Sequence, residues 1–188
     1  SYRAQLSGWR FVFLPEVVVP AEIPVEMDAF KIQQHRWTMG SIQTCIKVLP
    51  NLFRAKLPLR VKIEAVFHLT ASFNYPLMLA LVILIVPALF VRVAGGWQFL
   101  LLLDLPLFYG AMLSVVTFYA LSQREVRSNW LIQLRYIPIM MAVGIGLSFN
   151  NTKAVISALL NRNSRFTRTP KYGIVDKHDK WMDKCYRQ

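Results

Sequence analysis

Long apolar stretches alternate with polar, basic stretches along this chain. Residues 65–91 carry no acidic or basic side chain apart from His68, and residues 98–121 are interrupted only by Asp104 and Pro106. Each stretch is long enough for a membrane-spanning helix, which needs about 20 apolar residues. The pattern therefore predicts two spans that form a hairpin.

The connection between the two spans holds Arg92, a Gly95-Gly96 pair and Trp97. Glycines and an interfacial aromatic are typical of a short turn at the membrane surface. Asp104 either lines a channel through the membrane or pairs near the outer interface with a cation such as Arg92. We expect the pairing.

A third apolar stretch is marginal as a span, because residues 136–152 are uncharged for only 17 positions and contain proline and glycine. One crossing would also place the eight basic residues of 162–188 outside, against the positive-inside rule. We expect an interfacial or re-entrant helical segment over 131–160, kinked near Asn150 and Asn151, that stays on the cytoplasmic leaflet.

The zone before the membrane, residues 1–63, reads as cytosolic. Trp9–Leu14 and Val17–Val19 are rich in β-formers but are bounded by prolines, which predicts short or edge strands. A proline-free stretch with helical spacing follows from Met27 to about Val48, and a basic, apolar stretch over 49–62 fits an interfacial segment on anionic lipid.

Composition agrees with a chain partly embedded in lipid: 188 residues, 55% hydrophobic, 17% charged and a mean hydropathy of +0.37. The net charge of +12 comes from basic residues that bracket the apolar stretches, nine in 1–63 and eight in 162–188. This distribution predicts a multi-pass protein of the cell membrane with both termini cytoplasmic, and it does not resemble a nucleic-acid groove. We predict no nucleic-acid partner.

Cysteine and histidine are too scattered to predict a disulfide or a metal cage. Cys45 and Cys185 lie 140 positions apart, both in predicted cytoplasmic parts, and the histidines follow no ligand spacing. His68 is expected to be a hydrogen-bonded histidine at a helix end.

The run Gln33-Gln34-His35-Arg36-Trp37 joins three kinds of ligand contact. Arginine binds phosphate through two parallel N–H groups, glutamine hydrogen-bonds hydroxyls, and tryptophan can stack its flat face on a sugar ring. On a helix Gln33, Arg36 and Trp37 stand at i, i+3 and i+4, which places them on one face. By itself the run is also compatible with an ordinary amphipathic helix.

Placed before a membrane hairpin, this run resembles the Q-Q/R-x-R-W signature of processive family 2 glycosyltransferases, the cellulose-synthase-like superfamily of cellulose, mannan and glucomannan synthases. A second motif, Phe166-Thr167-Arg168-Thr169-Pro170-Lys171, resembles the F-x-V-T-x-K gating loop of bacterial cellulose synthase, with Arg168 in place of the valine. The stretches Ser1–Leu6, Gly8–Arg10 and Val19–Glu22 resemble the sequence directly after the family's T-E-D motif.

The resemblance implies an α-rich membrane protein fragment: the end of a cytosolic α/β (GT-A-like) domain in 1–63, a membrane region in 64–161, and a gating-loop segment and tail in 162–188. Gln33, Gln34, Arg36 and Trp37 would bind substrate, and Phe166, Arg168, Thr169 and Lys171 would close over it. The catalytic base is expected upstream of Ser1, and the ligands of the implied Mg²⁺ or Mn²⁺ outside the sequence.

The implied function is an inverting, processive polysaccharide synthase that transfers a hexose from UDP-glucose or GDP-mannose to a glycan acceptor and moves the product through its membrane region. Two alternatives stay open. One is a non-processive enzyme that glycosylates a lipid, and the other is a non-enzymatic membrane channel or scaffold subunit.

Overall fold

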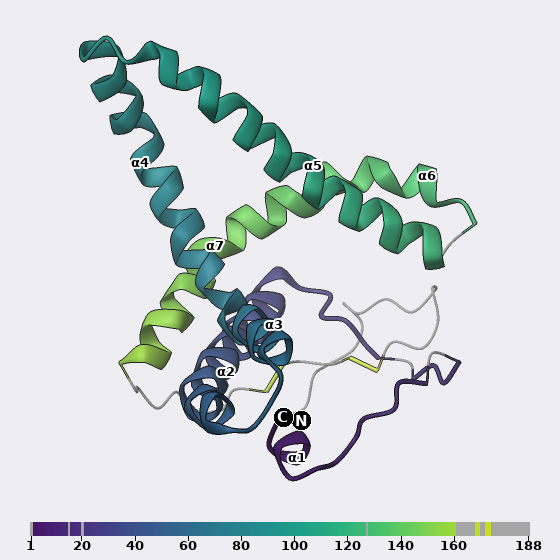
Figure 1. Ribbon diagram of the computed structural model, residues 1–188. Coiled ribbons are helices and arrows are strands. Elements are labelled where there is room, and N and C mark those ends of the chain that lie inside the picture. The colour runs from purple at the N-terminus through teal and green to yellow at the C-terminus, as the bar shows by residue number, and fades with distance from the viewer. Residues whose placement is uncertain are drawn as a thin grey trace. The chain divides into compact units, whose positions relative to one another are not determined.

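The computed structural model describes residues 2–14, 16–19, 21–126, 128–160, 168–169 and 172–173. Its order of elements is α1 (Tyr2–Leu6), α2 (Met27–Arg54), α3 (Leu59–Thr70), η1 (Ala71–Phe73), α4 (Asn74–Ala94), η2 (Gln98–Leu100), α5 (Leu101–Val126), α6 (Trp130–Gln133), η3 (Leu134–Tyr136) and α7 (Ile137–Leu159) (Figure 1). The chain divides into two compact units, one of 1–76 with 150–188 and one of 77–149.

The described residues are entirely helical or irregular, so the predicted strands are wrong there. Residues 9–14 and 16–19 are irregular, and apolar side chains such as Val12 and Phe13 are 80% and 86% exposed. A strand needs a neighbour to accept and donate its backbone hydrogen bonds, and the described part of the chain supplies none.

The predicted helix over Met27 to about Val48 is confirmed as α2, which begins at Met27 but continues to Arg54. Pro50, which follows the proline-free stretch, lies inside the helix. Proline leaves the carbonyl four residues earlier without a helical partner. That carbonyl belongs to Ile46, whose side chain is 51% exposed, so the freed group lies on an exposed side of the helix.

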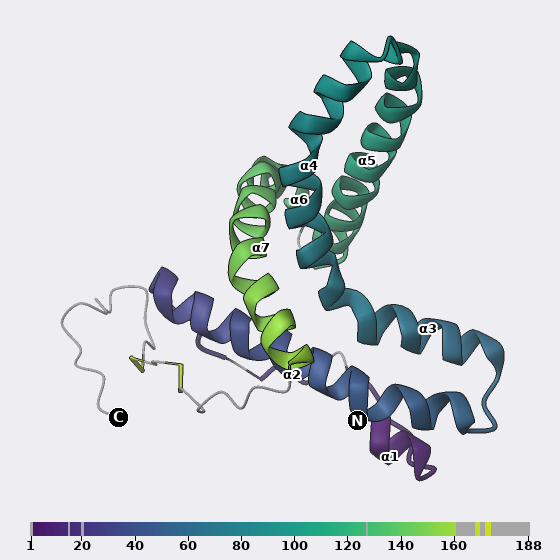
Figure 2. The ribbon, with the colours of Figure 1, turned by 90° about the vertical axis from the view of Figure 1, so that its left-hand side faces the viewer.

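Helices α2 and α3 lie side by side and antiparallel, joined by residues 55–58 (Figure 2). The buried face of α2 follows helical spacing and includes Thr38, Ile42, Cys45 and Leu52. The Lys62 ammonium donates to the Phe53 carbonyl at 2.8 Å across the connection.

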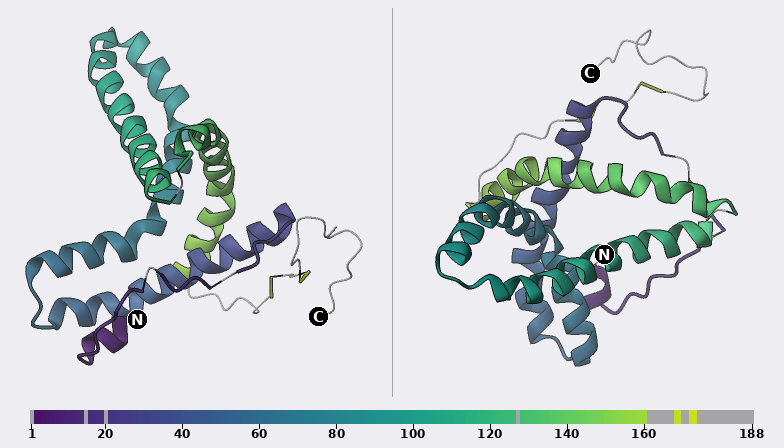
Figure 3. Two further views of the ribbon diagram at one scale, coloured as in Figure 1. Left: turned by 90° about the vertical axis from the view of Figure 1, so that its right-hand side faces the viewer. Right: turned by 90° about the horizontal axis from the view of Figure 1, so that it is seen from above.

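The last turns of α7 complete the first unit by lying against α2 (Figures 2 and 3). A buried cluster joins two residues of α2 to three of α7, with Phe73 packed beside it: Met39, Ile42, Ala154, Val155 and Ala158. Burial of a side chain such as Ile42, which is 0% exposed, contributes about 2 kcal/mol. Asn150 and Asn151, where a kink is expected, both lie inside the continuous helix α7.

Three helical stretches are long and apolar enough to cross a membrane: Leu59–Ala94, Gln98–Val126 and Trp130–Leu159. The first two contain the predicted spans. At the turn between them Gly96 has φ +69°, and a side chain on Gly95 would meet the Val91 carbonyl at 3.1 Å, so glycine is favoured at both positions.

Candidate functional site

Helix α2 presents the Gln33–Trp37 run near its amino-terminal end. Gln33, Gln34 and Arg36 are half-buried, whereas the Trp37 side chain is 58% exposed. The next residues, Thr38 and Met39, turn into the buried face. The helix therefore anchors its motif through the residues that follow it and leaves the indole of Trp37 accessible.

The two predicted motifs meet in the structure, although 133 positions separate them. The Arg36 guanidinium donates from Nη2 to the Thr169 hydroxyl at 3.1 Å, and Thr169 is only 9% exposed. Because the hydroxyl accepts this bond, its own O–H remains a donor for a second group. A guanidinium beside a hydroxyl donor can contact adjacent oxygens of one phosphate.

The rest of the predicted gating loop is described in part. Arg168 is exposed. Phe166 and Lys171 lie outside the described residues, so their predicted roles stay predictions.

The last turns of α7 contact α2 just before the motif. Asn150 donates from Nδ2 to the Lys31 carbonyl at 3.0 Å, one helical turn before His35. Burial, and then the positive charge of Lys153, lower the pKa of His35 below its usual value. Asn151 is 0% exposed and its Nδ2 has no hydrogen-bond partner among the described residues.

Similar proteins of known family identify the family of this chain. A family profile described as "Glycosyl transferase family group 2" matches residues 1–149. The chain belongs to this family. It is similar to a "Probable glucomannan 4-beta-mannosyltransferase 10" of Arabidopsis thaliana, 41% identical over 75 residues, which are 40% of this chain and 13% of that protein.

A second relative of this family 2 chain is a "Glucomannan 4-beta-mannosyltransferase 1" of Oryza sativa subsp. japonica, 38% identical over 69 residues, 36% of this chain and 13% of that protein. The chain thus matches only about an eighth of the length of these curated relatives. No solved structure matches it.

A divalent cation, which the family resemblance implies, does not fit the described residues. No group of three or more His, Cys, Asp or Glu side chains gathers among them. Within the same residues Cys45 is a free, buried thiol.

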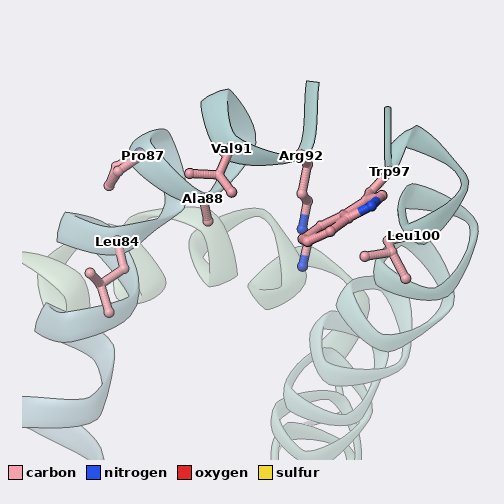
Figure 4. Close-up of a pocket in the computed structure, with 7 residues that line it drawn as sticks. All are labelled: Leu84, Pro87, Ala88, Val91, Arg92, Trp97 and Leu100. Carbon is pink, nitrogen blue, oxygen red and sulfur yellow. The ribbon is translucent and has the colours of Figure 1, made fainter. Parts of the chain in front are cut away.

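In the hairpin of this family 2 chain, the predicted pairing of Asp104 with Arg92 is confirmed. Arg92 also lines an open, mainly apolar pocket of about 430 Å³, where the Arg92 and Trp97 side chains point toward one another (Figure 4). An ion pair neutralises both charges where desolvation is costly. We therefore assign it to the stability of the hairpin.

His68 is hydrogen-bonded, as expected, by the Tyr2 hydroxyl at 2.7 Å. Sequence reasoning missed a different set of contacts, between two carboxylates before α2 and the residues that follow Thr169. They are Glu22, Glu26, Tyr172 and Gly173. The available signal was two glutamates four positions apart in a basic chain, directly before the helix that carries the motif.

Proposed function

We propose that this chain is part of a membrane-embedded, inverting glycosyltransferase that transfers mannose from GDP-mannose to a growing β-glycan. The observation that carries the proposal is the hydrogen bond from Arg36 to Thr169, which joins the two motifs that resemble the substrate-binding and gating segments of family 2 synthases. Family membership and the mannosyltransferase names of the relatives support the reaction class and the donor.

In this proposal Arg36 and Thr169 bind the donor diphosphate. As the sugar leaves the diphosphate, negative charge grows on the leaving oxygens, and a preorganised guanidinium stabilises that charge. The Thr169 hydroxyl donates to a neighbouring oxygen. Closure of the loop that holds Thr169 would exclude water, which otherwise competes with the acceptor hydroxyl.

The role proposed for Trp37 is to stack on the acceptor sugar and orient its hydroxyl toward the donor. Its exposed indole, adjacent to Arg36 in the chain, supports this role. Gln33 and Gln34 would hydrogen-bond the acceptor or the donor, and the base that deprotonates the acceptor would come from outside the described residues.

The contacts within the first unit also support a cytoplasmic topology for the third apolar stretch. Two membrane crossings, one by α4 and one by α5, would return the chain to the cytoplasmic side on which α2 is expected. Asn150 and Val155, near the end of α7, contact α2 itself. We infer that Trp130–Leu159 does not cross the membrane and lies at the cytoplasmic interface, although its length and apolarity would allow a span.

The experiment that tests the function uses membranes containing the full-length protein, supplied in parallel with radiolabelled GDP-mannose and UDP-glucose. We expect insoluble polymer from GDP-mannose that an endo-β-1,4-mannanase degrades. Label found only in an organic-extractable lipid would favour the single-transfer enzyme. No nucleotide binding at all would favour a scaffold and contradict the proposal.

A further inference from the structure

Glu22 holds the chain after Thr169 by both of its carboxylate oxygens. The Tyr172 backbone N–H donates to Oε1 at 2.7 Å, and the Gly173 N–H donates to Oε2 at 3.2 Å. Gly173 has φ +64°, a left-handed conformation that glycine adopts without strain. Successive N–H groups around such a residue can point to one side and bind an anion, here a carboxylate.

Glu26 adds a third bond, because the Tyr172 hydroxyl donates to its Oε1 at 2.6 Å. The hydrogen bond to Glu26, then burial, then the charge of Glu26 raise the pKa of the Tyr172 phenol above its usual value of 10.0. The phenol therefore remains a donor throughout the physiological pH range.

The position of these bonds relates them to the substrate site. Glu26 directly precedes the first residue of α2, and Arg36 lies about two and a half turns into that helix. Tyr172 follows Thr169 by only three residues. The residues around Thr169 are thus hydrogen-bonded at two places. Glu22, in the segment before α2, accepts from the Tyr172 N–H, and Arg36, on α2 itself, donates to Thr169.

We propose that Glu22 and Glu26 are positioning residues that hold the loop on α2 and so keep the Thr169 hydroxyl at Arg36 for the donor diphosphate. This inference rests on the proposed function. The carboxylates touch no substrate and act only through Thr169. We call the bonds of Tyr172 and Gly173 to Glu22 and Glu26 the clasp. Loss of the clasp weakens donor binding and leaves the rate of the chemical step nearly unchanged.

The test is Glu22→Gln in the full-length protein, compared with Glu16→Gln as a matched control in the same irregular segment, where Glu16 is exposed. Glutamine at this position has one carbonyl oxygen, which can accept from one of the two backbone N–H groups. Its NH₂ group would face the other N–H group, so that one bond is lost. Hydrogen exchange at the Tyr172 and Gly173 amides should accelerate roughly five- to tenfold. The donor KM should rise by a similar factor, with kcat changed less than about twofold.

A double-mutant comparison separates positioning from a direct role. In a Thr169→Val background Glu22→Gln should raise the donor KM no further, because its effect passes through the missing hydroxyl. Tyr172→Phe, which removes only the bond to Glu26, should give a smaller rise in wild type and none in the Thr169→Val background.

Unchanged amide exchange in Glu22→Gln would overturn the clasp, and a KM increase that persists in the Thr169→Val background would overturn the positioning role. A wild-type protein without transferase activity would instead overturn the proposed function, and the exchange rates would still decide whether the clasp exists.

Discussion

Arg36 and Thr169 share a hydrogen bond of 3.1 Å between Nη2 and the threonine hydroxyl, across 133 positions of sequence. The bond links helix α2 to a residue that lies ten positions beyond the end of α7 in the sequence. Since Thr169 is only 9% exposed, water competes weakly for its hydroxyl. The bond therefore holds the Thr169 hydroxyl at the Arg36 guanidinium.

Replacing the Thr169 hydroxyl should weaken donor binding. Thr169→Val keeps the shape of the side chain but loses the hydrogen bond. We expect a roughly five- to tenfold higher KM for GDP-mannose. Hydrogen bonds to charged groups contribute about 1.5–3 kcal/mol, and part of the contact with the donor remains in the variant. Thr169→Ser should restore the wild-type value. Thr44→Val is a matched control, because Thr44 is an exposed threonine of α2 that bonds the Gly40 carbonyl. Equal effects of the two valine variants would contradict the assignment.

The contact between α2 and α7 should weaken in mild acid. The pKa of His35 is lowered by burial first and by Lys153 second, so the folded protein binds fewer protons than the unfolded chain. Stability from this contact is fully present above pH about 6.5 and is lost as pH falls through the lowered pKa. The thermal midpoint in detergent should fall between pH 7.5 and 5.5.

Lys153→Met should reduce that fall, because it removes the second cause of the pKa shift. Lys31→Met is the control, since Lys31 pairs with Asp28 at 3.2 Å on the exposed side of α2. The same pH dependence in wild type and Lys153→Met would contradict the electrostatic link.

The pairing of Arg92 with Asp104 should stabilise the turn of the hairpin. Asp104→Asn leaves the cation without its partner, and the expected loss is about 1 kcal/mol, reduced by the partial exposure of both side chains. The thermal midpoint should fall by roughly 2–4 °C. The charge-reversed double variant Arg92→Asp/Asp104→Arg should recover most of it, and failure to recover would mean that packing, not charge, sets the effect.

The topology of the third apolar stretch can be tested by cysteine accessibility. Single cysteines at Arg168 and at Trp97, introduced in a background without Cys45 and Cys185, should react from opposite sides of the membrane, Arg168 from the cytoplasm and Trp97 from outside. Labelling of position 168 from the outside would mean that α7 crosses the membrane.

Local features of the fold were predictable from the sequence, whereas long-range contacts were not. The start of α2 at Met27 and the two apolar helices follow from periodicity, proline placement and length, and the Arg92–Asp104 pairing follows from the cost of isolated charges in lipid. The continuation of α2 through Pro50 was missed because an exposed carbonyl can remain without a helical partner.

The site itself was predictable only as two separate motifs. Resemblance identified Arg36 and Thr169, but no periodicity relates two positions so far apart, so their hydrogen bond is a finding of the structure. The bonds from Tyr172 and Gly173 to Glu22 involve backbone N–H groups, which any residue carries and no sequence pattern marks. The predicted strands failed because strand propensity is realised only with a partner strand.

Polymer synthesis by Trp37→Ala tests the proposal that the exposed face of α2 around Trp37 is the acceptor site of a polysaccharide synthase. Membranes with equal amounts of wild-type, Trp37→Ala and Phe53→Ala protein would receive labelled GDP-mannose, Phe53 being a second exposed aromatic of α2 with 52% exposure. We expect wild type and Phe53→Ala to make polymer and Trp37→Ala to make none. Normal polymer from Trp37→Ala would mean that Trp37 does not bind the acceptor.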